Sequence, residues 1–399
     1  MFAFSMRRLQ LAVLLAAASS ALSWDAAAWP GFKWEEWQRI TGVEKPSAVT
    51  PQSGHNDLLP LLSTDFESKS PICSVEQWEA KRKRILATLK EFFGTPGDLV
   101  PPKASAKELG RDDMGSYERI HLQIASDAND TVPAYLLRPK KLASAKVPVM
   151  IVLHQTQAPG KQEACGMIGN PEMAFAKELA EQGVLCIAPD AIGFGERIPA
   201  DAQPYANALD FYRKHPKWSF LGKMVWDVGR VIDYLETLPE VDPSRIGVIG
   251  HSHGAYGSIT AAVFEPRIKL VVASCGFTTL RTDPDPNRWS HLTALLPRLG
   301  YYVDDIDEAP FDWHEIIACI APKPFFNWAT LNDDIFPETE NLSEVYKQEE
   351  QIYGLFGRKQ VFVGKLAPGA HRFPAEVRKE VYDWIAFQFT EMAKKPPLN

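Results

Sequence analysis

A serine between two glycines, at the end of an apolar run, carries the strongest chemical signal in the sequence. Ser252 lies in the pentapeptide Gly-His-Ser-His-Gly, which matches the G-x-S-x-G pattern of a nucleophilic serine on a sharp turn. Residues 246–249 before it form a short β-type run, and residues 255–264 after it favour a helix. The glycines leave the room that a tight strand-to-helix turn needs, and the turn exposes the hydroxyl. We therefore predict that Ser252 is a nucleophile and that the amide of His253, at the start of the helix, stabilises an oxyanion.

A serine hydroxyl needs a base to take its proton, and the base needs an acid to orient it. In enzymes with this serine turn, the acid follows the serine along the chain and the histidine comes last. Downstream of His253, the remaining histidines are His291, His314 and His371. His371 lies in a loop between the last predicted strand and the last predicted helix, whereas the other two lie in or beside a segment that breaks the strand–helix pattern. His371 is therefore the predicted general base.

The acid is expected in the loop after the next-to-last predicted strand of the core, where the sequence reads Leu-Asn-Asp-Asp-Ile-Phe-Pro. Two neighbouring aspartates compete for the role. We favour Asp333, which is four residues before the proline, with Asp334 as its alternative. An acid from elsewhere in the chain, such as Asp312, also stays open.

A second amide for the oxyanion is expected in the loop after the predicted strand at residues 147–153. Thr156 is favoured for this role and Gln155 is the alternative. The chemistry requires neither a metal ion nor an organic cofactor. Because histidines two residues apart across a sharp turn point away from each other, His251 and His253 are not expected to bind a metal.

The elements that position these residues alternate between strand and helix. An antiparallel hairpin is predicted at residues 117–124 and 132–138. Further strands are predicted at residues 147–153, 184–188, 246–249, 270–275, 324–329 and 360–363. Helices are predicted at residues 171–182, 221–238, 255–264, 343–353 and 374–389. This alternation predicts an α/β fold with a mostly parallel central sheet and helices on both faces.

Two segments depart from this pattern. Residues 24–114 form an N-terminal extension, in which Ser74 and Gln77 make a capping-box signature for one helix that packs on the core. The predicted catalytic domain covers residues 115–399. Within it, residues 276–312 are rich in proline, aspartate and aromatic residues, and we expect them to form a lid-like insertion near the active site.

The first 23 residues have the composition of a signal peptide. Arg7 and Arg8 precede an apolar run that is shorter than a membrane span, and small residues follow it. We therefore expect a secreted or periplasmic protein that keeps no membrane attachment after cleavage. The charge balance is 43 Lys and Arg against 50 Asp and Glu, or −7, which disfavours nucleic acid as a partner. The five cysteines leave one disulfide open, and nothing in the sequence sets the oligomeric state.

These features together resemble the α/β-hydrolase superfamily over residues 115–392. The segments that carry the resemblance are VPVMIVLHQT, APDAIGFGER, VDPSRIGVIGHSHGAYGS, NWATLNDDIFP and APGAHRFP. Within the superfamily, they are similar to secreted dienelactone-hydrolase-like and acetyl-xylan-esterase-like proteins. The resemblance implies the α/β-hydrolase fold and a catalytic triad of Ser252, Asp333 and His371. Two features depart from the usual pattern: the oxyanion loop reads His-Gln-Thr, and histidines flank the serine on both sides.

The sequence thus predicts a serine carboxylic-ester hydrolase that works through an acyl-enzyme. Its expected substrates are small-molecule or carbohydrate esters, such as acetyl xylan. The alternative is a serine peptidase of the prolyl-oligopeptidase type. The region before residue 115 is too short and too unrepetitive for the propeller that those enzymes carry, so we favour the esterase.

Overall fold

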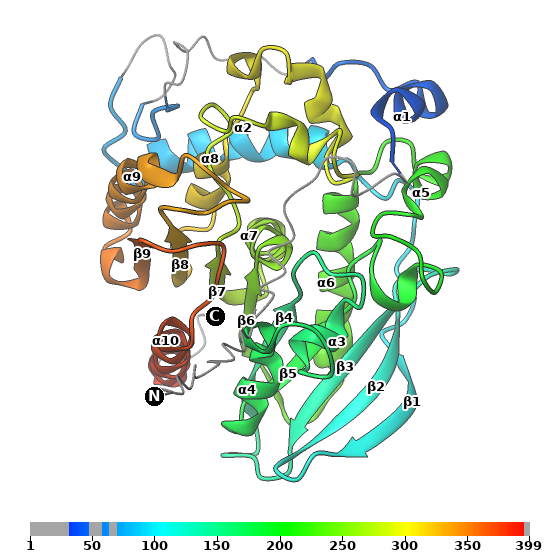
Figure 1. Ribbon diagram of the computed structural model, residues 1–399. Helices are drawn as coiled ribbons and strands as arrows, with labels where there is room; N and C mark the ends of the chain where they lie inside the picture. Colours follow the sequence, from blue (N-terminus) through cyan, green and yellow to red (C-terminus); the bar gives the residue numbers. More distant parts are fainter. Residues whose placement is uncertain (1–31, 48–57, 64–69, 395–399) are drawn as a thin grey trace, which may run out of the picture.

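A computed structural model describes residues 32–47, 58–63 and 70–394 of the chain (Figure 1). The predicted signal peptide, residues 1–23, lies outside this part. Within it, nine strands form one sheet in the order β1-β2-β3-β5-β4-β6-β7-β8-β9. The strands are β1 (Ala106–Asp113), β2 (Tyr117–Ala125), β3 (Thr131–Pro139), β4 (Val147–Leu153), β5 (Leu185–Pro189), β6 (Val241–His251), β7 (Ile268–Ser274), β8 (Phe325–Thr330) and β9 (Phe362–Ala367).

The sheet is antiparallel at one edge and parallel elsewhere. Strands β1, β2, β3 and β5 pair antiparallel in turn, and β5, β4, β6, β7, β8 and β9 pair parallel. The parallel strands end at the same edge of the sheet, so the loops that follow β4, β6, β8 and β9 can meet there. The predicted hairpin and mostly parallel sheet are confirmed.

Helices cover both faces of the sheet. They are α1 (Trp34–Thr41), α2 (Val75–Phe93), α3 (Lys161–Ala164), α4 (Phe175–Glu181), α5 (Ala208–Lys214), α6 (Phe220–Leu235), α7 (His253–Phe264), α8 (Trp313–Ala318), α9 (Leu342–Leu355) and α10 (Ala375–Ala393). Alternate residues of β4 point to opposite faces: Val149 and Ile151 belong to one apolar core, and Met150 and Val152 belong to the other. The first core is shared with α2, α6, α7, α8 and α9, and the second with α4 and α10.

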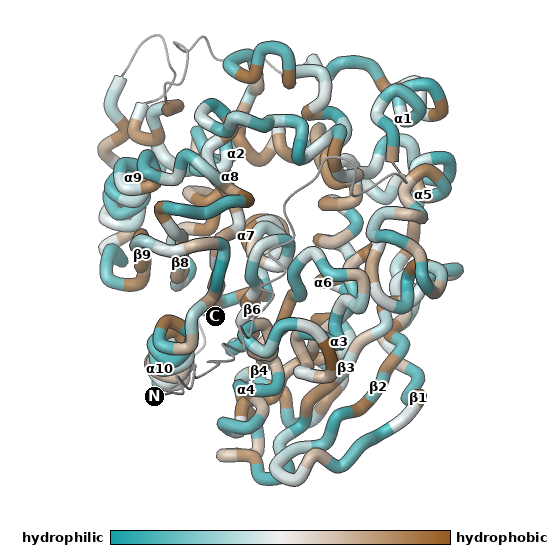
Figure 2. Tube along the Cα trace, in the orientation of Figure 1, coloured by the Kyte–Doolittle hydropathy of each residue, from teal (hydrophilic) through white to brown (hydrophobic). Residues whose placement is uncertain are grey.

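The described part of the N-terminal extension differs from the prediction, because it holds two helices and a strand instead of one helix. Strand β1 has the sequence Ala-Lys-Glu-Leu-Gly-Arg-Asp-Asp, and most of it is exposed. Figure 2 shows it mainly in hydrophilic colours. It is a strand because it pairs with β2, not because it buries an apolar face. Helix α2 begins as predicted, with the Ser74 hydroxyl accepting a hydrogen bond from the Gln77 amide.

The insertion at residues 276–312 contains three short 3₁₀ helices, Pro286–Trp289, Pro297–Tyr302 and Ile306–Glu308. Most of it is buried, and it contacts the N-terminal extension. The Trp34 indole donates to the carbonyl of Pro297 at 2.7 Å, and Lys45 forms an ion pair with Glu308 at 2.7 Å. The insertion is therefore packed against the N-terminal extension.

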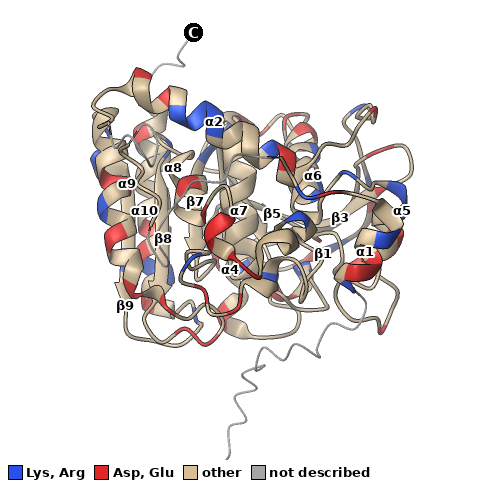
Figure 3. Ribbon diagram, turned by 90° about the horizontal axis from the view of Figure 1, so that it is seen from above, with Lys and Arg blue, Asp and Glu red and all other residues tan. Residues whose placement is uncertain are grey.

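The outer helices carry charges of both signs, interspersed along their exposed faces (Figure 3). This arrangement agrees with the small net charge of −7. No helix in the described part of the chain has the length and apolar character that a membrane crossing requires.

Helix α9 carries a buried carboxyl group that pairs with nothing else in the described residues. Glu349 has no exposed surface, and both of its side-chain oxygens lack a hydrogen-bond partner there. Burial alone raises the pKa of Glu349 well above its ordinary value of 4.5. The group is therefore protonated in the folded protein at pH values where it is ionised in the unfolded chain.

This difference makes the free energy of unfolding fall as the pH rises. Between the unfolded and the folded pKa, the unfolded chain has lost a proton that the folded protein retains. Each pH unit in this window then costs about 1.4 kcal/mol of stability. Glu349→Gln removes the titration, so we expect wild type to lose stability relative to this variant as the pH rises from about 5 towards 7. Urea unfolding of both proteins across this range measures the difference, and a difference that does not change with pH would contradict the assignment.

Candidate active site

Ser252 is held in a strained backbone conformation between β6 and α7. Its φ of +54° and ψ of −119° are unusual for a residue with a side chain, and such strain is typical of functional turns. Its amide donates to the carbonyl of Ser274, at the end of the neighbouring β7, at 2.8 Å. A side chain at Gly250 would collide with the backbone of Gly254. The predicted strand-to-helix turn is thus present, and its glycines are required sterically.

His371 and Asp333 are brought together from the loops after β9 and β8. The His371 Nδ1 atom lies 2.8 Å from Oδ2 and 3.0 Å from Oδ1 of Asp333. Asp333 is 4% exposed, and its Oδ1 accepts hydrogen bonds from the amides of Ile335 at 2.9 Å and Phe336 at 2.8 Å. These amides fix the carboxylate, and the carboxylate in turn orients the imidazole.

The imidazole of His371 lies next to the serine turn. The ring of His251, the residue before Ser252, has its centroid 4.7 Å from that of His371. The His371 side chain is 13% exposed, so it is accessible from outside while its Nδ1 side is covered. The fold therefore places the predicted base beside the turn that carries the predicted nucleophile, although 119 residues separate the two in the sequence (371 − 252).

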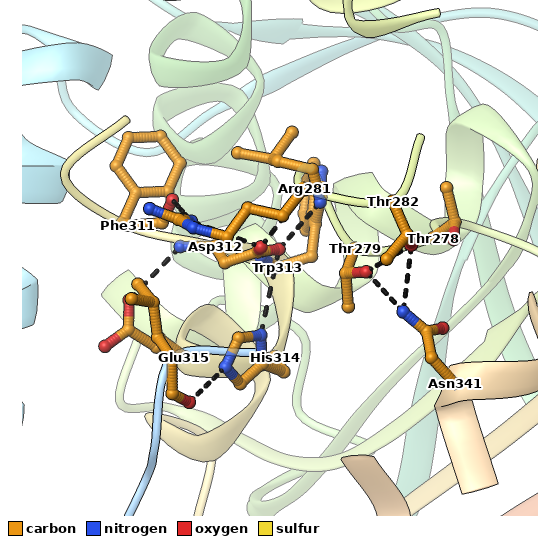
Figure 4. Close-up of polar contacts among 12 residues, drawn as sticks. Thr278, Thr279, Arg281, Thr282, Phe311, Asp312, Trp313, His314, Glu315 and Asn341 are labelled. Atoms are coloured by element: carbon orange, nitrogen blue, oxygen red, sulfur yellow. Dashed lines mark hydrogen bonds and ion pairs between the residues drawn. The ribbon is translucent and has the colours of Figure 1, made fainter. Parts of the chain in front are cut away.

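The two alternative acids lie in other surroundings. Asp334 is exposed, whereas Asp333 points inward to His371. Asp312 is buried as the N-cap of α8, where it accepts from the amides of Trp313 and Leu280 and forms an ion pair with Arg281 at 3.3 Å (Figure 4). Neither alternative is hydrogen-bonded to His371 within the described residues.

The other two downstream histidines also serve elsewhere. The ring of His291 stacks on Trp34 with 4.7 Å between centroids. His314 is buried, with Nε2 at 2.7 Å from the carbonyl of Leu59 and Nδ1 facing Asp312 at 3.7 Å (Figure 4). Both histidines connect the N-terminal extension with residues of the insertion or α8.

The loop after β4 contains the two candidates for the second oxyanion amide. The Gln155 side chain donates to the buried carboxylate of Glu163 at 2.9 Å. The Thr156 side chain lies close to the phenol of Tyr256 on α7. The loop is therefore anchored both to α3 and to the helix that begins after Ser252, with Thr156 on the side of that helix.

The histidines that flank Ser252 are buried and neutral. Burial, followed by the charge of His371, lowers the pKa of His251 well below its usual range. Burial also lowers the pKa of His253, whose ring stacks on that of His154 at 5.6 Å and 6°. The Nδ1 atom of His251 lies 2.9 Å from the hydroxyl of Ser274, so this ring links the serine turn to the end of β7.

Sequence reasoning gave no role to Cys275, the last residue of the strand predicted at residues 270–275. Cys275 follows β7 with a φ of +47°, and its thiol, the Asp333 carboxylate and a ring nitrogen of His371 lie within 4.8 Å of one another. Burial raises the pKa of Cys275 well above its ordinary value, so the thiol is neutral beside the carboxylate. A strained residue at a strand end is set by tertiary contacts, and the apolar run gave no signal for it.

Comparison with known proteins gives a family for this chain. Residues 125–357, more than half of the chain, match the family model "Glucuronyl esterase, fungi". A Bacillus subtilis protein named as a hydrolase, YtaP, is 26% identical over 311 residues, or 74% of this chain and 97% of that protein. A 4-O-methyl-glucuronoyl methylesterase of Wolfiporia cocos is 23% identical over 308 residues, or 72% of this chain and 70% of that one.

Solved structures show the same fold. A CE15 glucuronoyl esterase from Teredinibacter turnerae superimposes with a TM-score of 0.66 at 18% identity, over 89% of this chain and 99% of that one. The α/β-hydrolase fold expected from the sequence motifs is thus confirmed. The family match confirms the expected class of enzyme, a carboxylic ester hydrolase. With the serine turn and the hydrogen-bonded aspartate and histidine at the ends of its parallel strands, the chain belongs to the glucuronyl esterase family.

Proposed function

We propose that this protein is a serine esterase that hydrolyses esters of a carbohydrate, with Ser252, His371 and Asp333 as its triad. The hydrogen bond between His371 and Asp333, next to the strained turn of Ser252, carries the proposal. In the first step, His371 Nε2 takes the Ser252 proton as Oγ attacks the ester carbonyl. Asp333 accepts the hydrogen bond from Nδ1 and stabilises the imidazolium that forms.

The remaining steps follow from the same groups. Amides of His253 and Thr156 stabilise the oxyanion of the tetrahedral intermediate, which is where charge develops. The imidazolium of His371 then protonates the leaving alcohol, and an acyl-enzyme on Ser252 remains. Water, deprotonated by His371, attacks the acyl carbonyl and releases the acid and the free serine.

The names of the relatives favour a particular kind of ester. In 4-O-methyl-glucuronoyl esters the sugar supplies the carboxylic acid, whereas in acetyl xylan the sugar supplies the alcohol. We propose the first kind for this chain, so that the sugar acid is the group carried on Ser252. The family match supports this choice, and the comparisons give the alternative peptidase no support. We also propose that residues 1–23 direct export, which brings the enzyme to carbohydrate outside the cytoplasm.

A panel of substrates tests the proposal. We expect kcat/KM for methyl glucuronate to exceed that for acetylated xylan and 4-nitrophenyl acetate by about tenfold or more, because about 1.4 kcal/mol of added transition-state binding suffices for that ratio. Methanol release and acetate release are measured on the same enzyme preparation, with a prolyl peptide as a further substrate. A preference for acetylated xylan would show that the sugar supplies the alcohol of the ester instead of the acid. Cleavage of the peptide alone would contradict the esterase function.

A further inference from the structure

The insertion is hydrogen-bonded to the segment that carries the acid. The hydroxyl of Thr278 donates to the carbonyl of Glu338 at 3.1 Å, and the Asn341 amide donates to Thr279 at 2.6 Å and Thr282 at 2.9 Å. Figure 4 shows the contact between the threonines and Asn341. Residues 333–336, which we name the acid turn, lie just before this segment. The insertion thus holds the loop after β8 in place through these hydrogen bonds.

One residue of the insertion reaches the acid turn itself. The Nη1 atom of Arg288 donates to the carbonyl of Ile335 at 2.6 Å, and its guanidinium lies 5.3 Å from the ring centroid of Phe336. The same guanidinium is held by Asp283 through two bonds, Nε to Oδ2 at 2.6 Å and Nη2 to Oδ1 at 2.8 Å. Arg288 is 5% exposed, so this pair is buried.

A chain of hydrogen bonds leads from Arg288 to His371, the proposed base. Arg288 binds the carbonyl of Ile335, the Ile335 amide binds Asp333, and Asp333 binds His371. The ring of Phe336, under the guanidinium, also lies 5.8 Å from that of His371. A displacement of the acid turn would therefore move the carboxylate and the imidazole together.

We propose that Arg288 is a positioning residue that sets the acid turn and so orients Asp333 towards His371; this rests on the proposed function. A buried ion pair contributes little to stability by itself, because the cost of removing both charges from water offsets their attraction. A planar guanidinium held by two bonds does fix a geometry, and a further donor, on Nη1, is directed at the acid turn. Arg288 touches neither the substrate nor the reacting atoms in this proposal.

Arg288→Met tests the proposal, with Arg281→Met as the matched control. Arg281 is just as buried, but its hydrogen bonds reach Asp307, Ala309, Phe311 and Asp312. For Arg288→Met we expect kcat to fall by about ten- to a hundredfold, with KM within about threefold of wild type, because small misplacements of catalytic groups have effects of this size. For Arg281→Met, measured well below its unfolding temperature, we expect kcat close to that of wild type.

Two further readouts separate positioning from general damage. Since a misplaced carboxylate stabilises the imidazolium less, the acidic limb of the kcat/KM profile should move to lower pH in Arg288→Met. We expect the proton of the His371–Asp333 hydrogen bond to resonate strongly downfield in wild type, and this signal should be lost in Arg288→Met and retained in Arg281→Met. Arg288→Lys, whose ammonium group keeps the positive charge but not the planar fork, should recover part of kcat, and it provides the same readouts if Arg288→Met does not fold.

The outcomes distinguish this inference from the proposed function. Full activity and an unchanged pH profile in folded Arg288→Met would overturn the inference, as would equal losses in Arg288→Met and Arg281→Met. If Ser252→Ala is inactive in the same assay while Arg288→Met is unchanged, this inference alone fails. If Ser252→Ala is as active as wild type, the proposed function fails, and the positioning role falls with it.

Discussion

Ser252→Ala is expected to lower kcat by about 10⁶, which is the cost found when the nucleophile of a serine hydrolase is removed. Without Oγ no acyl-enzyme can form, and His371 has no proton to accept from the enzyme. The amides of His253 and Thr156, which we propose as the oxyanion donors, would remain, so a small rate above that in water should persist. The measurement is kcat on methyl glucuronate at enzyme concentrations high enough to detect the residual rate.

Ser258→Ala is the matched control for this loss. Ser258 lies on α7, is fully buried, and donates its hydroxyl to the carbonyl of Gly254 at 2.7 Å. We expect this variant to retain most of its activity, because the removed hydroxyl makes only a local bond. A serine-directed phosphonate should label wild type and Ser258→Ala, and it should leave Ser252→Ala unlabelled. An unlabelled wild type, or a labelled Ser252→Ala, would show that the nucleophile lies elsewhere.

The parts of this molecule that the sequence predicts are those set by local pattern. The turn at Ser252 depends on two glycines and on the strand and helix beside them, all within a few residues. The parallel strands are continuous apolar runs because both of their faces are covered, and that composition is visible without a structure. The order of serine, acid and histidine along the chain then directs attention to the two loops in which Asp333 and His371 are hydrogen-bonded.

Other parts depend on contacts between distant segments. Adjacent aspartates have the same chemistry, so residue type alone could not separate Asp333 from Asp334. The difference lies in burial and in the amides of Ile335 and Phe336. Strand β1 was missed because its residues are charged and its conformation comes from pairing with β2. The link from Arg288 to the acid turn joins residues 47 positions apart, and neither segment has a pattern that indicates it.

Asp333→Asn is expected to lower kcat by about 10⁴, close to the loss seen when the aspartate of a Ser-His-Asp triad is changed in this way. The amide keeps the shape of the carboxyl group, so the amides of Ile335 and Phe336 can still hold its oxygen. It carries no charge to stabilise the imidazolium, however. Its NH₂ group also favours the tautomer in which Nδ1 of His371 is the acceptor, and Nε2 then carries the proton and cannot take one from Ser252.

Asp334→Asn provides the control that the sequence itself offers. It makes the same chemical change one residue further along, on a side chain that is exposed and outside the hydrogen bonds of His371. We expect its kcat to stay within about twofold of wild type, since a surface charge beyond direct contact has a small effect on a partly buried site. Equal losses in the two variants would mean that the loop acts through its net charge. A loss of kcat confined to Asp334→Asn would show that Asp334 is the acid. The loop would then have to change conformation during catalysis so that Asp334 takes the place of Asp333.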